Sequence, residues 1–267
     1  MAVSLLETLT GNNVGTDVVT LGTFGSTLRV SLIETLTGNN VGTDAITLGT
    51  TGGTLLVSLL ETLTGNNVGT DVVTLGTFGN TLTVSLIETL TGNVGTDAVT
   101  LGTTGSTLAV SLIETLTGYN VGTDVVTLSN TSGNTLAVSL IETLTGSAGT
   151  DVITLGTAGN TLAVSLIETL TGNVGTDVVV LGTTGSTLSL SLSLVETLLG
   201  NNVGTDVVTL SNTSGNTLTV SLLETLTGNS VATDVITLGT FGSTLSVSLI
   251  ETLIGNNVGT DVVTLGS

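Results

Sequence analysis

The segment Leu86–Leu128, LIETLTGNVGTDAVTLGTTGSTLAVSLIETLTGYNVGTDVVTL, contains nearly the same unit twice. The order ETLTGN, VGTD, VTLG, TLxVSL returns along all 267 residues, with one Glu and one Asp in each copy. The ten aspartates recur at a nearly constant spacing, which gives a period of roughly 27 residues. Because a fixed period of this length is typical of repeat architectures, we interpret residues 1–267 as a single repeat array without a linker or domain boundary.

The periodicity inside each copy predicts β-strands. Residues 27–32, TLRVSL, alternate apolar and polar side chains, and the strand formers Thr and Val dominate every copy. Changes of one residue fall where turns are expected, as in GNNVGTD against GNVGTD. The longer insertion, in TLSLSLSLVET at residues 187–197, adds two residues and therefore keeps the inward and outward faces of a strand in step.

The fold class that follows is all-β, a single parallel β-solenoid. The strand-like pieces TLxVS, LIETLT and DVVTLG predict about ten coils, each of roughly 27 residues and three short strands, with bends at the Ser-Leu junction, GN(N)VGT and GTxGST. Coils about 4.8 Å apart would place equivalent residues over one another. A β-sandwich of roughly 30 short strands is the alternative, and it explains the near identity of the copies poorly. The side chains predicted to point inward in one copy are Val19, Leu21, Leu28, Val30, Ile33 and Leu36.

Composition excludes several classes of function. One basic residue, Arg29, stands against twenty acids, and the net charge is −19, so the phosphate contacts of a nucleic-acid-binding protein cannot be made. No apolar run reaches the roughly 18 residues of a transmembrane segment. The opening residues MAVSLLETLTG are already repeat sequence, and we expect no secretory leader there.

Stacking predicts that like charges lie over one another. Neighbouring carboxylates about 4.8 Å apart repel by about 0.9 kcal/mol even at the dielectric constant of water, so solvent, bound cations or protons must relieve them. For the Glu row we expect a solvated outer surface that deters lateral aggregation. Each Asp either closes its turn by accepting backbone N–H bonds, as in an Asx turn, or contributes to a site for Ca²⁺, which prefers oxygen ligands.

The turn sequence GNVGTDAVT at residues 92–100 resembles the nonapeptide GGxGxDxUx of the RTX, or hemolysin-type, calcium-binding repeat proteins. The preceding LIETLTG is similar to a segment that often accompanies such repeats. The resemblance implies a secreted bacterial β-roll whose turn carbonyls and Asp side chains hold Ca²⁺. The metal ligands that it implies are Asp17, Asp44, Asp71, Asp97, Asp124, Asp151, Asp177, Asp206, Asp234 and Asp261.

No enzyme site is predicted, because ten equal copies give no unique pocket and nothing separates the pKa values of two carboxyl groups. Regular Thr rows, such as Thr35 and Thr37 of ETLT, would suit an ice-binding face. An apolar outward stripe would suit an association surface on which copies bundle laterally. Its members are Val18, Ala45, Val72, Ala98, Val125 and Val207.

Neither end of the array is predicted to be capped, since it opens with AVSLLETLTG and closes with DVVTLGS. Two explanations stay open: a subunit that stacks on itself head to tail into a filament, or a segment of a longer repeat protein. We therefore expect a non-enzymatic structural protein, extracellular or at the cell surface, that builds a bacterial filament or sheath. The alternatives are a Ca²⁺-dependent RTX-like stalk of a secreted adhesin or toxin, and an ice-binding protein.

Overall fold

A computed structural model of the chain describes residues 1–12, 14–39, 41–66, 68–119, 121–182, 188–201, 205–256 and 258–266. The secondary structure of these residues is entirely β, in strands of two to six residues. The chain forms two compact units, Met1–Asn130 and Thr131–Ser267, and the same repeat runs through both. The all-β prediction is confirmed for the described part of the chain.

The strands of the first unit are β1 (Ala2–Val3), β2 (Thr8–Thr10), β3 (Val18–Leu21), β4 (Thr27–Ser31), β5 (Thr35–Thr37), β6 (Ala45–Leu48), β7 (Thr54–Ser58), β8 (Thr62–Thr64), β9 (Val72–Leu75), β10 (Thr81–Ser85), β11 (Thr89–Thr91), β12 (Ala98–Leu101), β13 (Thr107–Ser111), β14 (Thr115–Thr117) and β15 (Val125–Leu128). Those of the second unit are β16 (Thr135–Ser139), β17 (Thr143–Thr145), β18 (Val152–Leu155), β19 (Thr161–Ser165), β20 (Thr169–Thr171), β21 (Val178–Leu181), β22 (Leu188–Ser193), β23 (Thr197–Leu199), β24 (Asp206–Leu210), β25 (Thr217–Ser221), β26 (Thr225–Thr227), β27 (Val235–Leu238), β28 (Thr244–Ser248), β29 (Thr252–Ile254) and β30 (Val262–Leu265).

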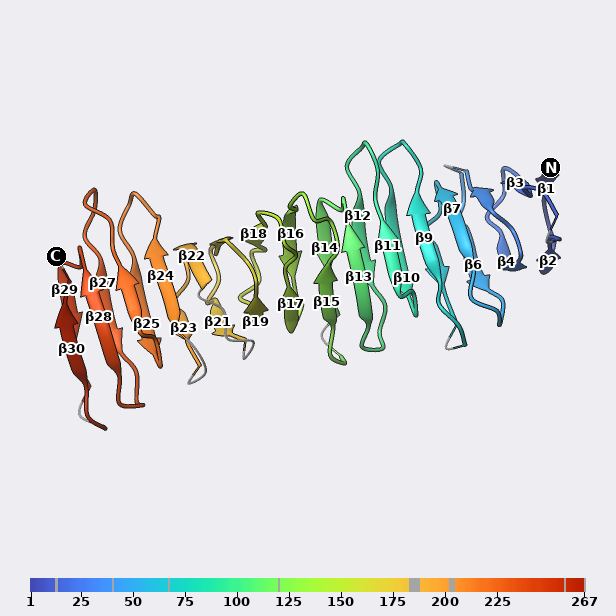
Figure 1. The fold of residues 1–267 in the computed structure, drawn as a ribbon. Coiled ribbons are helices and arrows are strands. Elements are labelled where there is room, and N and C mark those ends of the chain that lie inside the picture. Colours follow the sequence, from blue (N-terminus) through green and yellow to red (C-terminus); the bar gives the residue numbers. More distant parts are fainter. Residues whose placement is uncertain are drawn as a thin grey trace. The chain divides into compact units, whose positions relative to one another are not determined.

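In each unit the odd-numbered strands form one parallel sheet and the even-numbered strands form another (Figure 1). A strand therefore pairs with the strand two places along the chain, as Val18 of β3 does with Thr35 of β5. One coil holds two strands, so two repeats of three strands fill three coils. Each unit has fifteen strands, which at two per coil make about seven coils, or about 14 in the chain.

The predicted class of fold is thus right, but the predicted number of strands per coil is wrong. Three strands per repeat are present, but ten coils of three strands each are not, because a coil closes after two strands. A two-sheet coil lets the inner side chains of one sheet pack directly on those of the other. This flattened arrangement suits short side chains, and the chain has no Trp and only three Phe.

The core of each unit consists of aliphatic side chains between the two sheets. All six residues predicted to point inward in the first copy are buried, from Leu36 at 0% exposure to Ile33 at 7%. Pairing links Val19 to Leu36, Leu36 to Val57 and Val57 to Leu75, so unlike aliphatic residues stack on one another. The prediction that equivalent residues lie over one another is therefore wrong. Burying each such side chain stabilises the coil by roughly 1.5–3 kcal/mol.

The two-residue insertion preserves the faces, as predicted. Strand β22 has Leu192 in register with Leu170 of β20 and Leu210 of β24, and all three side chains are buried. Residues 183–187, which include the start of the insertion, lie outside the described residues.

The bend at the Ser-Leu junction is a sharp corner with an unusual backbone. The leucine after Ser has a left-handed conformation in all ten copies, with φ between 52° at Leu194 and 58° at Leu5. This conformation costs a non-glycine residue roughly 1–2 kcal/mol, and it persists because the next residue, such as Ile87, is anchored in the core. Corners, Gly-Asn turns and GTxGS turns are the three links between strands, at the positions that the sequence predicts.

Candidate functional site

The turns of each solenoid unit line two edges. One edge, called here the first edge, holds the turns from even- to odd-numbered strands, and the second edge holds those from odd- to even-numbered strands. Along either edge, a GTxGS turn, a Gly-Asn turn and a Leu-Ile-Glu corner follow one another in successive coils. This order arises because the repeat contains three types of strand, whereas successive strands alternate between two sheets.

An aspartate closes each Gly-Asn turn or its equivalent, and at internal copies it joins three coils, as Asp97 does. The carboxylate of Asp97 accepts the N–H of Asn80 in the preceding coil at Oδ1 (2.9 Å) and the N–H of Asn93 in its own turn at Oδ2 (3.0 Å). The N–H of Asp97 donates to Oε2 of Glu114 in the next coil at 2.8 Å. Asp97 is fully buried, and its carboxylate also accepts an Nδ2–H of Asn80 at 2.9 Å, so that three hydrogen bonds to the carboxylate compensate for much of the loss of water.

The same network recurs at other copies. Asp44 accepts the N–H groups of Ser26 (2.9 Å) and Asn39 (3.0 Å), and its own N–H donates to Glu61 at 2.7 Å. This geometry supports the interpretation of Asp as the residue that closes its turn. It also explains the glycine at the start of the turn, since a Cβ on Gly92 would overlap the carbonyl oxygen of Leu112 at the neighbouring corner.

The aspartates do not form one row. Asp17, Asp71, Asp124, Asp177 and Asp234 precede odd-numbered strands. Asp44, Asp97, Asp151 and Asp261 precede even-numbered strands, and Asp206 begins one. Neighbouring aspartates of one edge are therefore three coils apart, or about 14 Å at 4.8 Å per coil. Their repulsion falls from about 0.9 to about 0.3 kcal/mol at the dielectric constant of water. The expected close stack of aspartates is wrong, and much of the predicted repulsion disappears with it.

The glutamates are not a solvated outer row either. From Glu34 to Glu224 they are half-buried at the corners, and most of them accept the N–H of the aspartate in the preceding repeat. The glutamates for which this bond is described are those at 34, 61, 88, 114, 168, 196, 224 and 251. Each of these glutamates accepts a backbone N–H of a neighbouring coil. Both the aspartates and the glutamates therefore hold successive coils together.

Asp206 differs from the other acids. It begins strand β24 and lies in register with Leu188, and burial raises the pKa of its carboxyl group above the usual value. The N–H of Asn201, 3.0 Å from Oδ2, lowers the same pKa and offsets part of this effect.

The described residues contain no group of three or more His, Cys, Asp or Glu side chains arranged to hold a metal ion. The carboxylate oxygens of the aspartates already accept hydrogen bonds from N–H groups. A Ca²⁺ ion at these residues would therefore have to bind turn carbonyl oxygens and the remaining lone pairs of the carboxylates. Ca²⁺ ligation by these residues stays a prediction.

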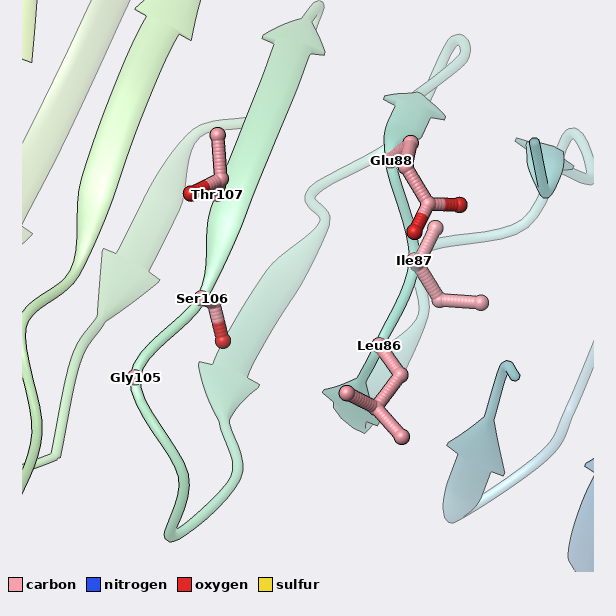
Figure 2. Close-up of a pocket in the computed structure, with 6 residues that line it drawn as sticks. All are labelled: Leu86, Ile87, Glu88, Gly105, Ser106 and Thr107. Atoms are coloured by element: carbon pink, nitrogen blue, oxygen red, sulfur yellow. The ribbon is translucent and has the colours of Figure 1, made fainter. Parts of the chain in front are cut away.

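A groove in the first unit is part of the repeat. It has a volume of about 270 Å³ and lies between Leu86–Glu88 of a corner and Gly105–Thr107 of the following GTxGS turn, as Figure 2 shows. A groove of about 210 Å³ occurs two repeats earlier, at Leu32–Glu34 and Thr51–Thr54. Two repeats are also three coils, so the two grooves occupy equivalent places on the solenoid. Glu88 is the one titratable group in the lining described, and its carboxylate accepts the N–H of Asp71 at 2.8 Å.

The fold and the turn network define a parallel β-solenoid repeat protein. No protein-family model, no curated protein and no solved structure matches this chain. Among the residues that the structure describes, no helix is long and apolar enough to cross a membrane.

Sequence reasoning missed the period of two repeats, although a signal was present. Phe24 and Phe78 occupy GTxGS turns of the first and third copies, where the second and fourth have Thr51 and Thr104. In the first unit, Val and Ala likewise alternate directly after the aspartates. Such alternation is expected when successive copies lie on opposite sides of the solenoid.

Proposed function

We propose that the chain is a non-enzymatic structural protein whose copies stack end to end into an extracellular filament or sheath of a bacterium. The observation that carries the proposal is that described coils along the chain are joined by the same parallel strand pairing and the same Asp-to-Glu hydrogen bond, as from Asp97 to Glu114. Strand types follow the order TLxVS, ETLT, DVVTL throughout; β30 is of the DVVTL type, and β1 is of the TLxVS type that comes next. A second copy therefore resumes the cycle where the first copy leaves it.

Internal pairs supply the register of this contact. Strand β5 pairs with β7 through Leu36 and Val57, so β29 would pair with β1 of the next copy through Leu253 and Val3. Likewise β3 pairs with β5 through Val19 and Leu36. Strand β30 would then pair with β2 of the next copy, with Val263 opposite Leu9.

The acid network would be completed by the same contact. At internal coils the aspartate N–H donates to a glutamate of the following coil, as from Asp234 to Glu251 at 2.7 Å. Asp261 is followed by no further glutamate in the chain, and Glu7 is preceded by no aspartate. Stacking would place Glu7 of one copy against the N–H of Asp261 of another. The side chains of Val262 and Leu265, which are exposed in a single copy, would become less exposed to solvent.

Proline at Val263 tests end-to-end growth. The N–H of Val262 donates to the carbonyl of Ser243, directly before β28, and the N–H of Gly266 donates to Val247 of β28, so the N–H of Val263 points to the unpaired side of β30. Val263→Pro removes that donor, and proline is tolerated on edge strands. We expect filaments of the unaltered chain in electron micrographs and short or no filaments for Val263→Pro. The control Val263→Ala keeps the donor and should still polymerise. A chain that stays monomeric at high concentration, or a proline variant that polymerises normally, would contradict the proposal.

A Ca²⁺-dependent, RTX-like stalk is the second candidate, favoured by the aspartate at each Gly-Asn turn of a parallel solenoid. Titration calorimetry with Ca²⁺ and thermal melting in a chelator test it. For such a stalk we expect heat of Ca²⁺ binding and a lower melting temperature in chelator. No heat of binding together with an unchanged melting temperature would rule it out.

Ice binding is a third candidate, supported by hydroxyl side chains on the outside of the even-numbered strands, where Thr62 pairs with Thr83 and Thr83 with Thr100 by way of β8, β10 and β12. Thermal hysteresis of a solution of the chain is the measurement. A freezing point equal to the melting point excludes this function.

A further inference from the structure

The second edge of the first unit carries more apolar surface than its fold requires. All three phenylalanines of the chain lie in GTxGS turns from odd- to even-numbered strands: Phe24, Phe78 and Phe241. On the first edge of the first unit the same turns have Thr51 and Thr104. Phe24 and Phe78 are 74% and 71% exposed, so they add little to the core, and threonine serves the same turn. Their restriction to one edge points to a contact outside the chain.

Phe24 and Phe78 each lie beside the Gly-Asn turn of the next coil. A Cβ on Gly42 would be 3.3 Å from the carbonyl carbon of Phe24, and a Cβ on Gly95 would be 3.2 Å from that of Phe78. The residues directly before these two glycines are exposed valines, Val41 and Val94. Each pair of neighbouring turns therefore forms one apolar ridge, with a phenylalanine from one coil and a valine from the next.

A leucine corner links one ridge to the next. Leu59 and Phe78 line a groove of about 260 Å³ together with Leu56 of β7. Leu59 has φ of 57°, a conformation that glycine adopts at lower cost, yet all ten copies have leucine there. One apolar side chain per coil thus follows the second edge from β1 to β14, and we call this set the apolar row: Leu5, Phe24, Val41, Leu59, Phe78, Val94 and Leu112.

Carboxylates lie along the apolar row, and they decide what can cover it. Asp44 and Asp97 are fully buried, whereas Glu61 and Glu114 are half-buried at leucine corners of the second edge. The one basic side chain of the chain, Arg29, is on strand β4 and not in a turn. A neutral partner would take water from these glutamates and offer no charge in return, which costs free energy. A partner with Lys or Arg beside its apolar side chains supplies the complementary charge.

We propose that the apolar row binds a cationic amphipathic helix of another protein. An α-helix rises by about 5.4 Å per turn, close to the spacing of about 4.8 Å between coils. A helix that lies along the edge therefore offers roughly one apolar side chain to each coil, and its flanking cations face Glu61 and Glu114. The apolar row spans about 30 Å, the length of about 20 helical residues. This contact is lateral, so it goes beyond end-to-end stacking and does not depend on it.

Fluorescence anisotropy with a labelled synthetic peptide tests the proposal on the full chain. The probe is a helical peptide of about 20 residues with leucines on one face and lysines on the others. We expect it to bind the unaltered chain. The same peptide with glutamine in place of lysine should bind at least tenfold more weakly, and with glutamate it should not bind.

Two matched double variants decide where the peptide binds. Phe24→Thr with Phe78→Thr should weaken binding at least tenfold, while melting like the unaltered chain, since Thr51 and Thr104 already occupy equivalent turns. Val68→Thr with Val121→Thr removes exposed valines from the first edge and should leave the affinity unchanged.

Equal effects of the two double variants would mean that the lysine peptide binds the acidic chain without regard to the apolar row, and would overturn the proposal. An unaltered chain that does not bind the lysine peptide, or that binds the glutamine peptide as tightly, would also overturn it. So would binding to zwitterionic lipid vesicles in the absence of peptide binding, which would assign the apolar row to a membrane. If the peptide binds as expected but filaments fail to form, end-to-end stacking alone is overturned.

Discussion

The strands and the turns of this solenoid obey different rules. Inside the strands, Val, Leu and Ile replace one another freely, and Leu36 packs between Val19 and Val57. At the turns the same residue types return in nearly every copy, with an aspartate that bonds one glutamate and two backbone N–H groups. The core therefore requires only aliphatic volume, whereas the turns fix which coil lies on which. Substitutions at the two places should differ accordingly.

The largest effect is expected at a turn. Asp97→Ala leaves the N–H groups of Asn80 and Asn93 without their acceptor in a fully buried position. At roughly 1–3 kcal/mol per unsatisfied group, we expect a loss of about 3–5 kcal/mol in the free energy of unfolding, measured with urea. Asp261→Ala, in the last coil, is the control and should cost much less because Asp261 is only half-buried. Equal losses at the two positions would contradict the role assigned to the turn network.

A strand position should cost somewhat less and accept exchange. Leu90 is fully buried and in register with Val73 and Val110, and Leu90→Ala should destabilise the chain by about 2–4 kcal/mol. Leu90→Ile should cost less than about 1.5 kcal/mol, because this core already mixes aliphatic shapes. Urea unfolding of both variants checks the difference. A severe loss with isoleucine would mean that the core, and not the turns, specifies the stacking.

The raised pKa of Asp206 predicts a pH-dependent contribution of its turn to stability. Burial raises the pKa of Asp206 in the folded chain, so the folded state binds this proton more tightly than the unfolded state does. Its contribution to stability is present at low pH and is lost as the pH rises through the raised pKa. The stability advantage of the unaltered chain over Asp206→Asn should therefore shrink from acidic to neutral pH in urea unfolding. An advantage that grows with pH would contradict the sign of the shift.

The smallest effect, and a favourable one, is expected at a corner. Leu112 has φ of 54° and is 50% exposed, and glycine adopts this conformation without steric cost. Leu112→Gly should change the free energy of unfolding by less than about 1 kcal/mol, toward higher stability, because the relieved strain exceeds the lost packing. Thermal melts of the variants check this prediction. Val110→Gly, two residues earlier in a core strand, is the comparison and should be clearly destabilising. A large loss at Leu112 would show that the leucine itself is needed at the corner.

Sequence alone predicted the side-chain faces and the turns, because alternation with period two decides which residues point inward, as at Leu28 and Val30. It also offered the turn-closing interpretation of the aspartates as one of two. It did not predict how many strands close a coil. The three strand types have the same pleat and similar lengths, so any of them can stack on any other, as Leu36 does on Val57. The alternation of Phe24 and Thr51, and of Val72 and Ala98, was the signal that successive copies face opposite ways.

The apolar stripe predicted from sequence is divided for the same reason. Val18, Val72 and Val125 lie on strands of the odd-numbered sheet, whereas Ala45, Ala98 and Val207 lie on strands of the even-numbered sheet. A single stripe through all six is wrong, because it assumed that each copy lies directly over the one before.

Disulfide cross-linking tests the stacking of strands most directly, and the chain has no cysteine of its own to interfere. Thr35 and Leu56 are register partners on neighbouring coils, so the double variant Thr35→Cys, Leu56→Cys should cross-link on mild oxidation. Arg29 and Leu56 are equivalent positions of successive repeats but occupy β4 and β7, in opposite sheets, so Arg29→Cys with Leu56→Cys should stay reduced. The reverse outcome, a bond between positions 29 and 56 and none between 35 and 56, would mean that each repeat is one coil and would contradict the two-strand coil.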